Sequence, residues 1–326
     1  MVFIAEMLDG KLNYQIDTME SLPIISLSEL EKASPEEIKK LYDVCYEHGF
    51  FYIKEHGIGS EIINQTIDAS RKFFKLPEDV KLNYRHDIQK VYPKHCRGYS
   101  PLYGELLDGE QADPKEIFDL GIERPLSEQP FTGPTVIPDD SIAPGFASSH
   151  YQLQNEILTK VVPKLLKGLA LALGLEANWF DKYFIDPTFI HRTVYYPPGF
   201  GKAGKHTDTG IFTVLIQEYF PTPSLRVYTK DKWIDVPCIE DTFVINLGDM
   251  LQSWTKDLFV STPHEVIHNR PDDDRVSIPI FVFPNIETII QPLGTTETIP
   301  SKEVMLNNFL SIWETGEGSG RAKELV

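Results

Sequence analysis

The sequence predicts an α+β protein in which helices surround a β core. The chain has 326 residues, enough for two ordinary domains or one large β fold. Its first half shows helical hydrophobic periodicity around one short apolar run. After Asp186, short runs rich in Val, Ile, Phe, Tyr and Thr alternate with turn residues. Many short strands at this spacing are typical of a sandwich or barrel, with the helices packed against it.

The N-terminal region, residues 20–136, is expected to form helices around a short buried strand. Residues 34–37 (SPEE) have the form of a capping box with proline at the first helical position. Residues 50–53 (FFYI) predict a buried strand, and a second helix is expected over residues 60–74. The remainder of this region is rich in Pro, Gly and acidic residues, which is typical of loops that carry substrate contacts.

The rest of the chain is expected to supply supporting helices, the β core and a last helix. Residues 149–185 have a helical pattern with a bend near Pro163. Residues 186–295 contain the strand-like runs, and residues 301–326 are expected to form a C-terminal helix and tail. The clearest strand-like runs are 192–196, 212–216, 224–228, 233–236, 242–247 and 277–283.

Composition excludes several classes of protein. The chain is 41% apolar and 24% charged, as in ordinary globular proteins, which argues against disorder and coiled coil. A net charge of −17 argues against nucleic-acid binding, which needs clustered Lys and Arg. There is no signal-peptide-like core and no apolar run long enough to span a bilayer. The three cysteines form no CxxC pair. We therefore expect a cytoplasmic protein with neither a membrane segment nor an obligate protein partner.

Three residues are candidate metal ligands. In His206-Thr207-Asp208, the histidine and the carboxylate are two residues apart, so on a strand both point to one face. No other histidine in the chain lies two residues before a carboxylate. The best third ligand is His264, 56 residues after Asp208 and so on a facing part of a small barrel. Two histidines and one carboxylate on one face are the arrangement of non-haem Fe(II) oxygenases.

A second pattern indicates a carboxylate receptor. Arg275-Val276-Ser277 opens an apolar strand 11 residues after His264. Arg275 and Ser277 would point inward together, and a guanidinium donates two parallel charge-assisted hydrogen bonds to a carboxylate. A buried arginine left without a partner would be costly. A carboxylate ligand beside an Fe(II) site explains its position.

The motifs together resemble the iron- and 2-oxoglutarate-dependent oxygenases, in particular the isopenicillin N synthase-like subgroup. The resemblance spans about residues 20 to 290, and its motifs are specific as a set. It rests on residues 22–25 (LPII), 48–53 (HGFFYI), 195–198 (YYPP), 206–208 (HTD), 246–249 (NLGD), 261–264 (STPH) and 275–277 (RVS). The NLGD segment is expected to form a turn between core strands.

The resemblance implies a fold, a cofactor and roles for individual residues. The fold is a double-stranded β-helix, or jelly roll, flanked by helices. Fe(II) would be bound by the three ligands named above, with O2 and 2-oxoglutarate as co-substrates. Arg275 and Ser277 would hold the distal carboxylate of 2-oxoglutarate, and Tyr196 matches a tyrosine that often donates to it. The implied activity is oxidation of a small molecule by hydroxylation, desaturation or cyclisation, with release of succinate and CO2.

Two departures from the family pattern concern the substrate. Many relatives carry Asn at the position of Val194 and Arg at the position of Glu265. Arg192 is in phase with Tyr196 on the same strand, so it could assist the proximal carboxylate of the keto acid. The barrel mouth is expected to be bordered by the acidic loop over residues 105–113, with Glu105 and Phe212 as candidate substrate contacts. This acidic rim favours a small neutral or amine-bearing substrate.

Three other functions stay open. An oxidase of the isopenicillin N synthase kind uses no keto acid, and Arg275 and Ser277 would then hold the substrate's own carboxylate. A likeness to microbial ethylene-forming enzymes rests on Gly98-Tyr99 and the acids that follow. A non-catalytic protein could keep the fold, although it has no need of a complete ligand set.

Overall fold

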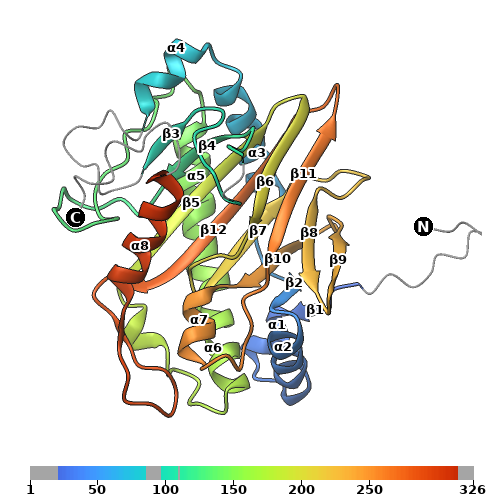
Figure 1. The fold of residues 1–326 in the computed structure, drawn as a ribbon, viewed down its shortest axis with the longest axis vertical. Helices are drawn as coiled ribbons and strands as arrows, with labels where there is room; N and C mark the ends of the chain where they lie inside the picture. Colours follow the sequence, from blue (N-terminus) through green and yellow to red (C-terminus); the bar gives the residue numbers. More distant parts are fainter. Residues whose placement is uncertain (1–20, 86–96, 109–110, 315–326) are drawn as a thin grey trace, which may run out of the picture.

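Two facing β-sheets form the centre of the molecule, and helices cover the outer face of the larger one (Figure 1). The computed structural model describes residues 21–85, 97–108 and 111–314. The larger sheet has the strand order β1-β2-β10-β7-β12-β5-β4-β3, and the smaller has the order β6-β11-β8-β9. From β5 to β12 the chain passes repeatedly from one sheet to the other, which is jelly-roll topology. The predicted α+β class and double-stranded β-helix are confirmed.

The elements have the following bounds. The strands are β1 (Ile24–Ser26), β2 (Phe50–Lys54), β3 (Gly98–Ser100), β4 (Glu116–Leu120), β5 (Pro187–Tyr196), β6 (Gly199–His206), β7 (Phe212–Gln217), β8 (Leu225–Thr229), β9 (Lys232–Val236), β10 (Thr242–Leu247), β11 (His264–Arg270), β12 (Arg275–Asn285), β13 (Ile289–Ile290) and β14 (Ile299–Pro300). The α-helices are α1 (Leu27–Glu31), α2 (Pro35–Glu47), α3 (Ser60–Phe74), α4 (Glu78–Lys81), α5 (Phe146–Glu156), α6 (Val162–Ala172), α7 (Asp249–Trp254) and α8 (Ser301–Glu314).

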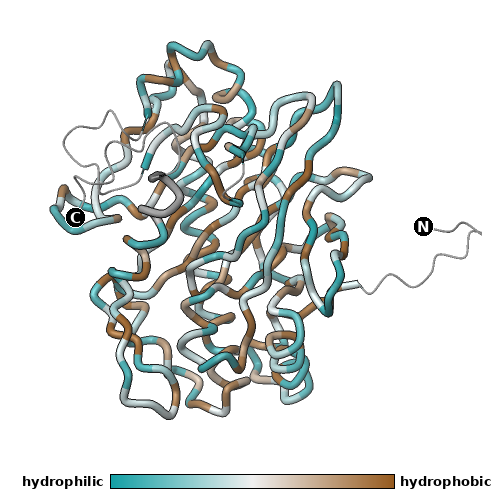
Figure 2. Tube along the Cα trace, viewed as in Figure 1, coloured by the Kyte–Doolittle hydropathy of each residue, from teal (hydrophilic) through white to brown (hydrophobic). Residues whose placement is uncertain are grey.

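Strand alternation sends one set of side chains to the helices and the other into the barrel. On β12, Val276, Ile278 and Ile280 are buried in the cluster that also contains helix residues. Arg275 and Ser277, which alternate with these residues along the strand, line the barrel interior instead. The strands and the helices behind them both carry recurrent hydrophobic residues (Figure 2). The barrel interior is therefore free to hold polar groups while the outer face of the sheet supplies the core.

The helices fall close to the positions that the sequence predicts. Pro35 is the first residue of α2, and α3 covers the predicted range, residues 60–74. The bend expected near Pro163 is a π-helical segment, Ile157–Val161, between α5 and α6. This segment ends two residues before the proline, where the missing N–H and the ring prevent regular α-helical bonding.

A buried histidine pair joins α5 to β5 and predicts acid-sensitive stability. His150 Nδ1 lies 3.0 Å from His191 Nε2, and His150 Nε2 lies 2.9 Å from Ser70 Oγ. Burial lowers the pKa of His191 to about 3 and holds the pKa of His150 well below its usual range. Both rings are therefore neutral in the folded chain at pH values where the unfolded chain is protonated.

We expect the free energy of unfolding to fall as the pH drops below about 6.5, because His150 and His191 then become protonated in the unfolded chain but not in the folded one. Each histidine that is protonated only in the unfolded chain lowers the free energy of unfolding by up to about 1.4 kcal/mol per pH unit. Urea unfolding at pH 7.5 and pH 5 measures this slope. The variant His191→Gln should have a shallower slope, and an unchanged slope would contradict this origin of the pH dependence.

Candidate active site

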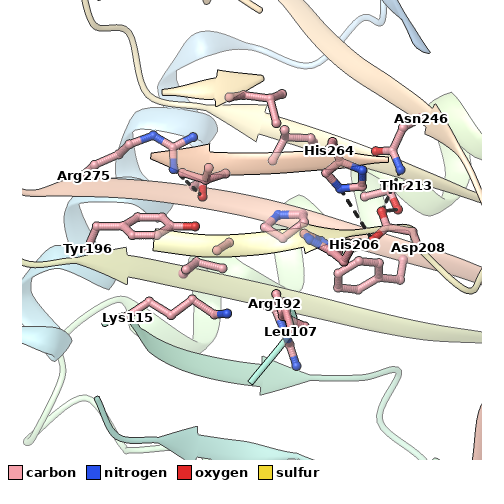
Figure 3. Close-up of a pocket in the computed structure, with 18 of the residues that line it drawn as sticks. Leu107, Lys115, Arg192, Tyr196, His206, Asp208, Thr213, Asn246, His264 and Arg275 are labelled. Carbon is pink, nitrogen blue, oxygen red and sulfur yellow. Dashed lines mark hydrogen bonds and ion pairs between the residues drawn. The ribbon is translucent and has the colours of Figure 1, made fainter. Parts of the chain in front are cut away.

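The three predicted ligands meet where β6 and β11 pair inside the barrel. His206 ends β6, His264 begins β11, and the two residues are cross-strand partners in the antiparallel register. Asp208 Oδ1 lies 3.7 Å from Nε2 of His206 and 3.8 Å from Nε2 of His264. One ligand atom from each residue lies within 4.8 Å of the others, and the three side chains converge on one point (Figure 3).

Hydrogen bonds to the backbone set the orientation of both imidazoles. His206 Nδ1 is 2.6 Å from the carbonyl oxygen of Gly204, and His264 Nδ1 is 3.1 Å from that of Thr262. A carbonyl only accepts hydrogen bonds, so each Nδ1 carries the proton and each Nε2 has a free lone pair directed at the common point. Burial, followed by the neighbouring His264, lowers the pKa of His206, which keeps that ring neutral.

Asp208 is oriented in the same way. Its Oδ2 atom accepts hydrogen bonds from Thr213 Oγ1 and from Asn246 Nδ2, the latter at 2.7 Å. The Oδ1 atom remains directed at the two imidazoles. Two imidazole nitrogens and one carboxylate oxygen that converge beside a cavity fit a divalent metal of the Fe(II) type. Among the described residues, no second His, Cys, Asp or Glu cluster of this kind was found.

A buried cation lies in the same cavity. Arg275 is 2% exposed, and its Nη1 is 3.2 Å from Ser277 Oγ. Its Cζ lies 5.1 Å from the centre of the Tyr196 ring. Burial lowers the pKa of Arg275, and in the described part of the chain no carboxylate lies within 4.0 Å of it. An arginine held in this way is a receptor for an anion.

One cavity connects this cation to the three ligands. Its wall contains Arg275 and Ser277 at one end, with Tyr196 beside Arg275, and the metal ligands at the other end (Figure 3). A second cavity also borders His206 and Asp208 and has a volume of about 300 Å³. The metal ligands therefore border two spaces, and Arg275 lines only the first of them.

Family models and relatives match nearly the whole chain. A model described as the non-haem dioxygenase in morphine synthesis N-terminal region matches residues 22–140, and one for the 2OG-Fe(II) oxygenase superfamily matches residues 187–284. A probable iron/ascorbate oxidoreductase of Dictyostelium discoideum is 33% identical over 88% of this chain and 87% of that protein. The chain belongs to the 2OG-Fe(II) oxygenase superfamily. Its cofactor is Fe(II), held by His206, Asp208 and His264, and its co-substrate is 2-oxoglutarate.

Other relatives of this oxygenase act on or bind chemically different molecules. A homoarginine-6-hydroxylase of Oryza sativa subsp. japonica is 31% identical over 78% of this chain and 80% of that protein. The crystal structure of a full-length Neurospora crassa protein in complex with alpha-KG and thymine has a TM-score of 0.76 and 25% identity, covering 89% of this chain and 97% of that one. These matches support the isopenicillin N synthase-like subgroup and leave the substrate open.

The oxygenase contains no candidate membrane helix among its described residues. None of these helices combines the length with the apolar character that a bilayer crossing requires.

Arg192 lies between the two cavities of the oxygenase but is already paired. Its Nε and Nη2 donate to the two carboxylate oxygens of Asp119 at 2.8 and 2.7 Å, and Nη2 also lies 2.9 Å from Glu105 Oε1. Burial would lower the pKa of Arg192, but the two carboxylates raise it overall. Arg192 borders both cavities, and its expected contact with the proximal carboxylate of the keto acid stays a prediction. Its pairing was not visible in the sequence.

The two residues expected to contact substrate lie elsewhere. Glu105 is buried among Arg192 and Lys115, and Phe212 is buried on the helix-facing side of β7. Neither side chain lines a cavity beside the metal. Leu107 and Thr213, their neighbours in the sequence, line the cavities instead. The structure therefore gives no support to Glu105 and Phe212 as substrate contacts.

The acidic loop does not present an open acidic rim. Glu105 and Asp113 are paired with Lys115, and Asp108 is paired with Lys202. Residues 109–110, which include Glu110, lie outside the described residues. Because each described acid of this loop contacts a cation, the loop does not present the open acidic rim that would favour a cationic substrate.

Asn246 has a role that the sequence analysis missed. It was expected to belong to a turn, but it lies on β10 and its amide binds the metal-ligand carboxylate of Asp208. The only signal was its place in the NLGD motif, two residues before a glycine that packs against the HTD segment. A built Cβ on Gly248 would lie 2.8 Å from the carbonyl oxygen of Asp208, so only glycine fits there.

We expect Asn246→Ala to weaken Fe(II) binding by about 10- to 100-fold, the usual cost of losing an outer partner of a metal ligand. The carboxylate of Asp208 would lose one of its two donors and some of its fixed orientation. Titration of the metal-free protein with Fe(II) under argon measures the effect. Asn269→Ala, on the outer part of β11, is the control and should bind the metal normally. Equal affinity in both variants would show that Asn246 does not support the site.

Proposed function

We propose that the chain oxidises a small molecule by hydroxylation, desaturation or cyclisation while it converts 2-oxoglutarate to succinate and CO2. The observation that supports this most is the buried Arg275, which faces the same cavity as the metal ligands and has no carboxylate partner among the described residues. Because one cavity is lined by the metal ligands and by Arg275, a dicarboxylate bound at the metal would extend toward this guanidinium. Its distal carboxylate then supplies the charge that Arg275 lacks.

The side chains have separate tasks in this proposal. Arg275 and Ser277 bind the distal carboxylate, and the phenol of Tyr196 donates to the co-substrate from the adjacent strand β5. Burial raises the pKa of Tyr196 to about 12, so the phenol keeps its proton and remains a donor at neutral pH. Bound Fe(II), together with 2-oxoglutarate and O2, supplies the oxidising power. The apolar walls formed by Phe50, Leu215 and Val266 exclude water from this space.

The keto-acid requirement tests the proposal. We expect Fe(II)-loaded protein to release succinate from 2-oxoglutarate slowly alone and faster with a substrate. Without 2-oxoglutarate, substrate turnover should fall below detection. Succinate and product are measured together in the presence and absence of the keto acid.

One relative favours a different outcome of the same experiment. A 1-aminocyclopropane-1-carboxylate oxidase of Dictyostelium discoideum is 27% identical over 83% of this chain and 84% of that protein. If this chain were an oxidase without a keto acid, Arg275 would hold the carboxylate of its substrate. Full turnover without 2-oxoglutarate would establish that alternative. Ethylene in the headspace above a reaction with 2-oxoglutarate would instead indicate an ethylene-forming enzyme.

A further inference from the structure

The larger cavity beside the metal has walls of a consistent chemical kind. Its volume of about 300 Å³ is at the lower limit for a drug-sized ligand, so it suits a small molecule. Four of the lining residues are large and apolar: Leu107, Ile190, Phe281 and Phe283. Apart from the metal ligands, the polar groups on the wall are Arg192, Thr207, Thr209 and Asn308. The body of the ligand is therefore expected to be apolar, and few polar groups fix its orientation.

Arg192 has hydrogen-bond donors that its protein partners do not use. A guanidinium has five N–H groups. Asp119 accepts one from Nε and one from Nη2, and Glu105 accepts one from Nη1 at 3.1 Å. Nη2 also lies 2.9 Å from Glu105 Oε1, but this ion-pair contact is not a hydrogen bond. Among the described residues, one N–H of Nη1 and one N–H of Nη2 have no hydrogen-bond partner. The side chain is 11% exposed and borders the cavity, with its planar group 5.7 Å from the centre of the Phe281 ring.

The charge of Arg192 is already balanced within the protein. Glu105, Asp113 and Asp119 are buried acids, and Lys115 and Arg192 are the cations that contact them. Three carboxylates thus share two cations. Burial raises the pKa of Asp113 and Asp119, although the neighbouring Lys115 and Arg192 lower it, and despite burial these cations hold the pKa of Glu105 below its usual value.

This balance disfavours both kinds of charged ligand. A carboxylate beside Arg192 would be a fourth negative charge near two cations, so it would be repelled as well as desolvated. An ammonium group would meet an N–H donor, and the only carboxylate on the described wall is Asp208, which holds the metal. A neutral hydrogen-bond acceptor is not repelled by the carboxylates, and it can accept from the N–H donor.

We propose that this cavity selects an uncharged small molecule with an apolar body and a carbonyl oxygen that accepts a remaining N–H of Arg192. The inference rests on the proposed function, since it assigns this space to the molecule that is oxidised. Glu105 is then a specificity-determining residue: it has no contact with the ligand, but its charge prevents Arg192 from acting as a carboxylate receptor. Arg275, which has no such partner among the described residues, is the receptor for the anionic co-substrate in the other cavity.

Three probes with one apolar body test the proposal by calorimetry. Fe(II)-loaded protein is first titrated with 2-oxoglutarate under argon, and the complex is then titrated with phenylacetamide, phenylacetate or phenethylamine. Phenylacetamide should bind at least about tenfold more tightly than either charged probe. In Glu105→Gln the cluster has two carboxylates and two cations, so the preference for phenylacetamide over phenylacetate should shrink by about tenfold. Glu287→Gln, an exposed acid paired with Lys302, is the control and should keep the wild-type preference.

The outcomes separate failure of this proposal from failure of the proposed function. Tighter binding of phenylacetate or phenethylamine than of phenylacetamide would overturn the proposal, as would heat from none of the three probes. An unchanged preference in Glu105→Gln would overturn the role of Glu105. If 2-oxoglutarate itself does not bind, the proposed function fails. If 2-oxoglutarate binds but the probes do not show the expected order, only the inference about the substrate fails. Thermal unfolding of Glu105→Gln checks that the variant is folded.

Discussion

Replacing His264 with alanine is expected to abolish both turnover and stable iron binding. The imidazole supplies one of three ligand atoms at the metal point, and no described His, Cys, Asp or Glu forms a further cluster that could take its place. Loss of an outer partner already costs about 10- to 100-fold in affinity, so loss of a ligand should cost more. Iron content after desalting and the rate of succinate release measure the two effects.

His268→Ala is the matched control for this variant. His268 lies on the same strand four residues further on, and its Nε2 bonds to the carbonyl oxygen of Asp273 at 2.9 Å instead of facing the metal point. We expect this variant to retain iron. Iron retained in His264→Ala and lost in His268→Ala would reverse the assignment of the third ligand.

Arg275→Lys is expected to raise the apparent KM for 2-oxoglutarate by about 10- to 150-fold. Lysine keeps the charge but replaces a planar two-pronged donor with a point charge on a flexible stem. Loss of one hydrogen bond to a charged group is worth roughly 1.5–3 kcal/mol, which corresponds to that range. Initial rates of succinate release at a series of 2-oxoglutarate concentrations give the KM.

Arg226→Lys provides the control, because Arg226 lies on β8 and pairs with Glu265, and it does not line the cavity. Its KM should be that of the wild type. An unchanged KM in Arg275→Lys would contradict the assignment of Arg275 as the co-substrate receptor and would favour the keto-acid-independent oxidase.

Sequence spacing was sufficient for the residues that share one strand or one short motif. Arg275 and Ser277 were placed together by their two-residue spacing, and both lie on β12, where strand alternation brings them to one face. The same spacing placed His206 with Asp208, but β6 ends at His206 and Asp208 lies two residues beyond the strand. The third ligand followed from the length of chain between two segments of a barrel. In the structure, the β6–β11 register places His264 directly opposite His206.

Which face of a strand points inward could not always be read from the sequence. The β7 strand has apolar residues on both faces, so its pattern does not distinguish the barrel interior from the helix side. A shift of one residue exchanges the two faces, which is why Phe212 is buried against the helices and Thr213 reaches Asp208. The pairing of Glu105 with Arg192 joins residues 87 positions apart in the chain and has no local signal.

Diffraction at the iron absorption edge, from crystals grown with Fe(II) and 2-oxoglutarate under argon, is the most direct test that this chain is an iron- and 2-oxoglutarate-dependent oxygenase. We predict one anomalous peak in contact with Nε2 of His206, Oδ1 of Asp208 and Nε2 of His264, and 2-oxoglutarate extending from that peak to the guanidinium of Arg275. An anomalous peak at any other set of side chains, or a keto acid bound away from Arg275, would contradict it.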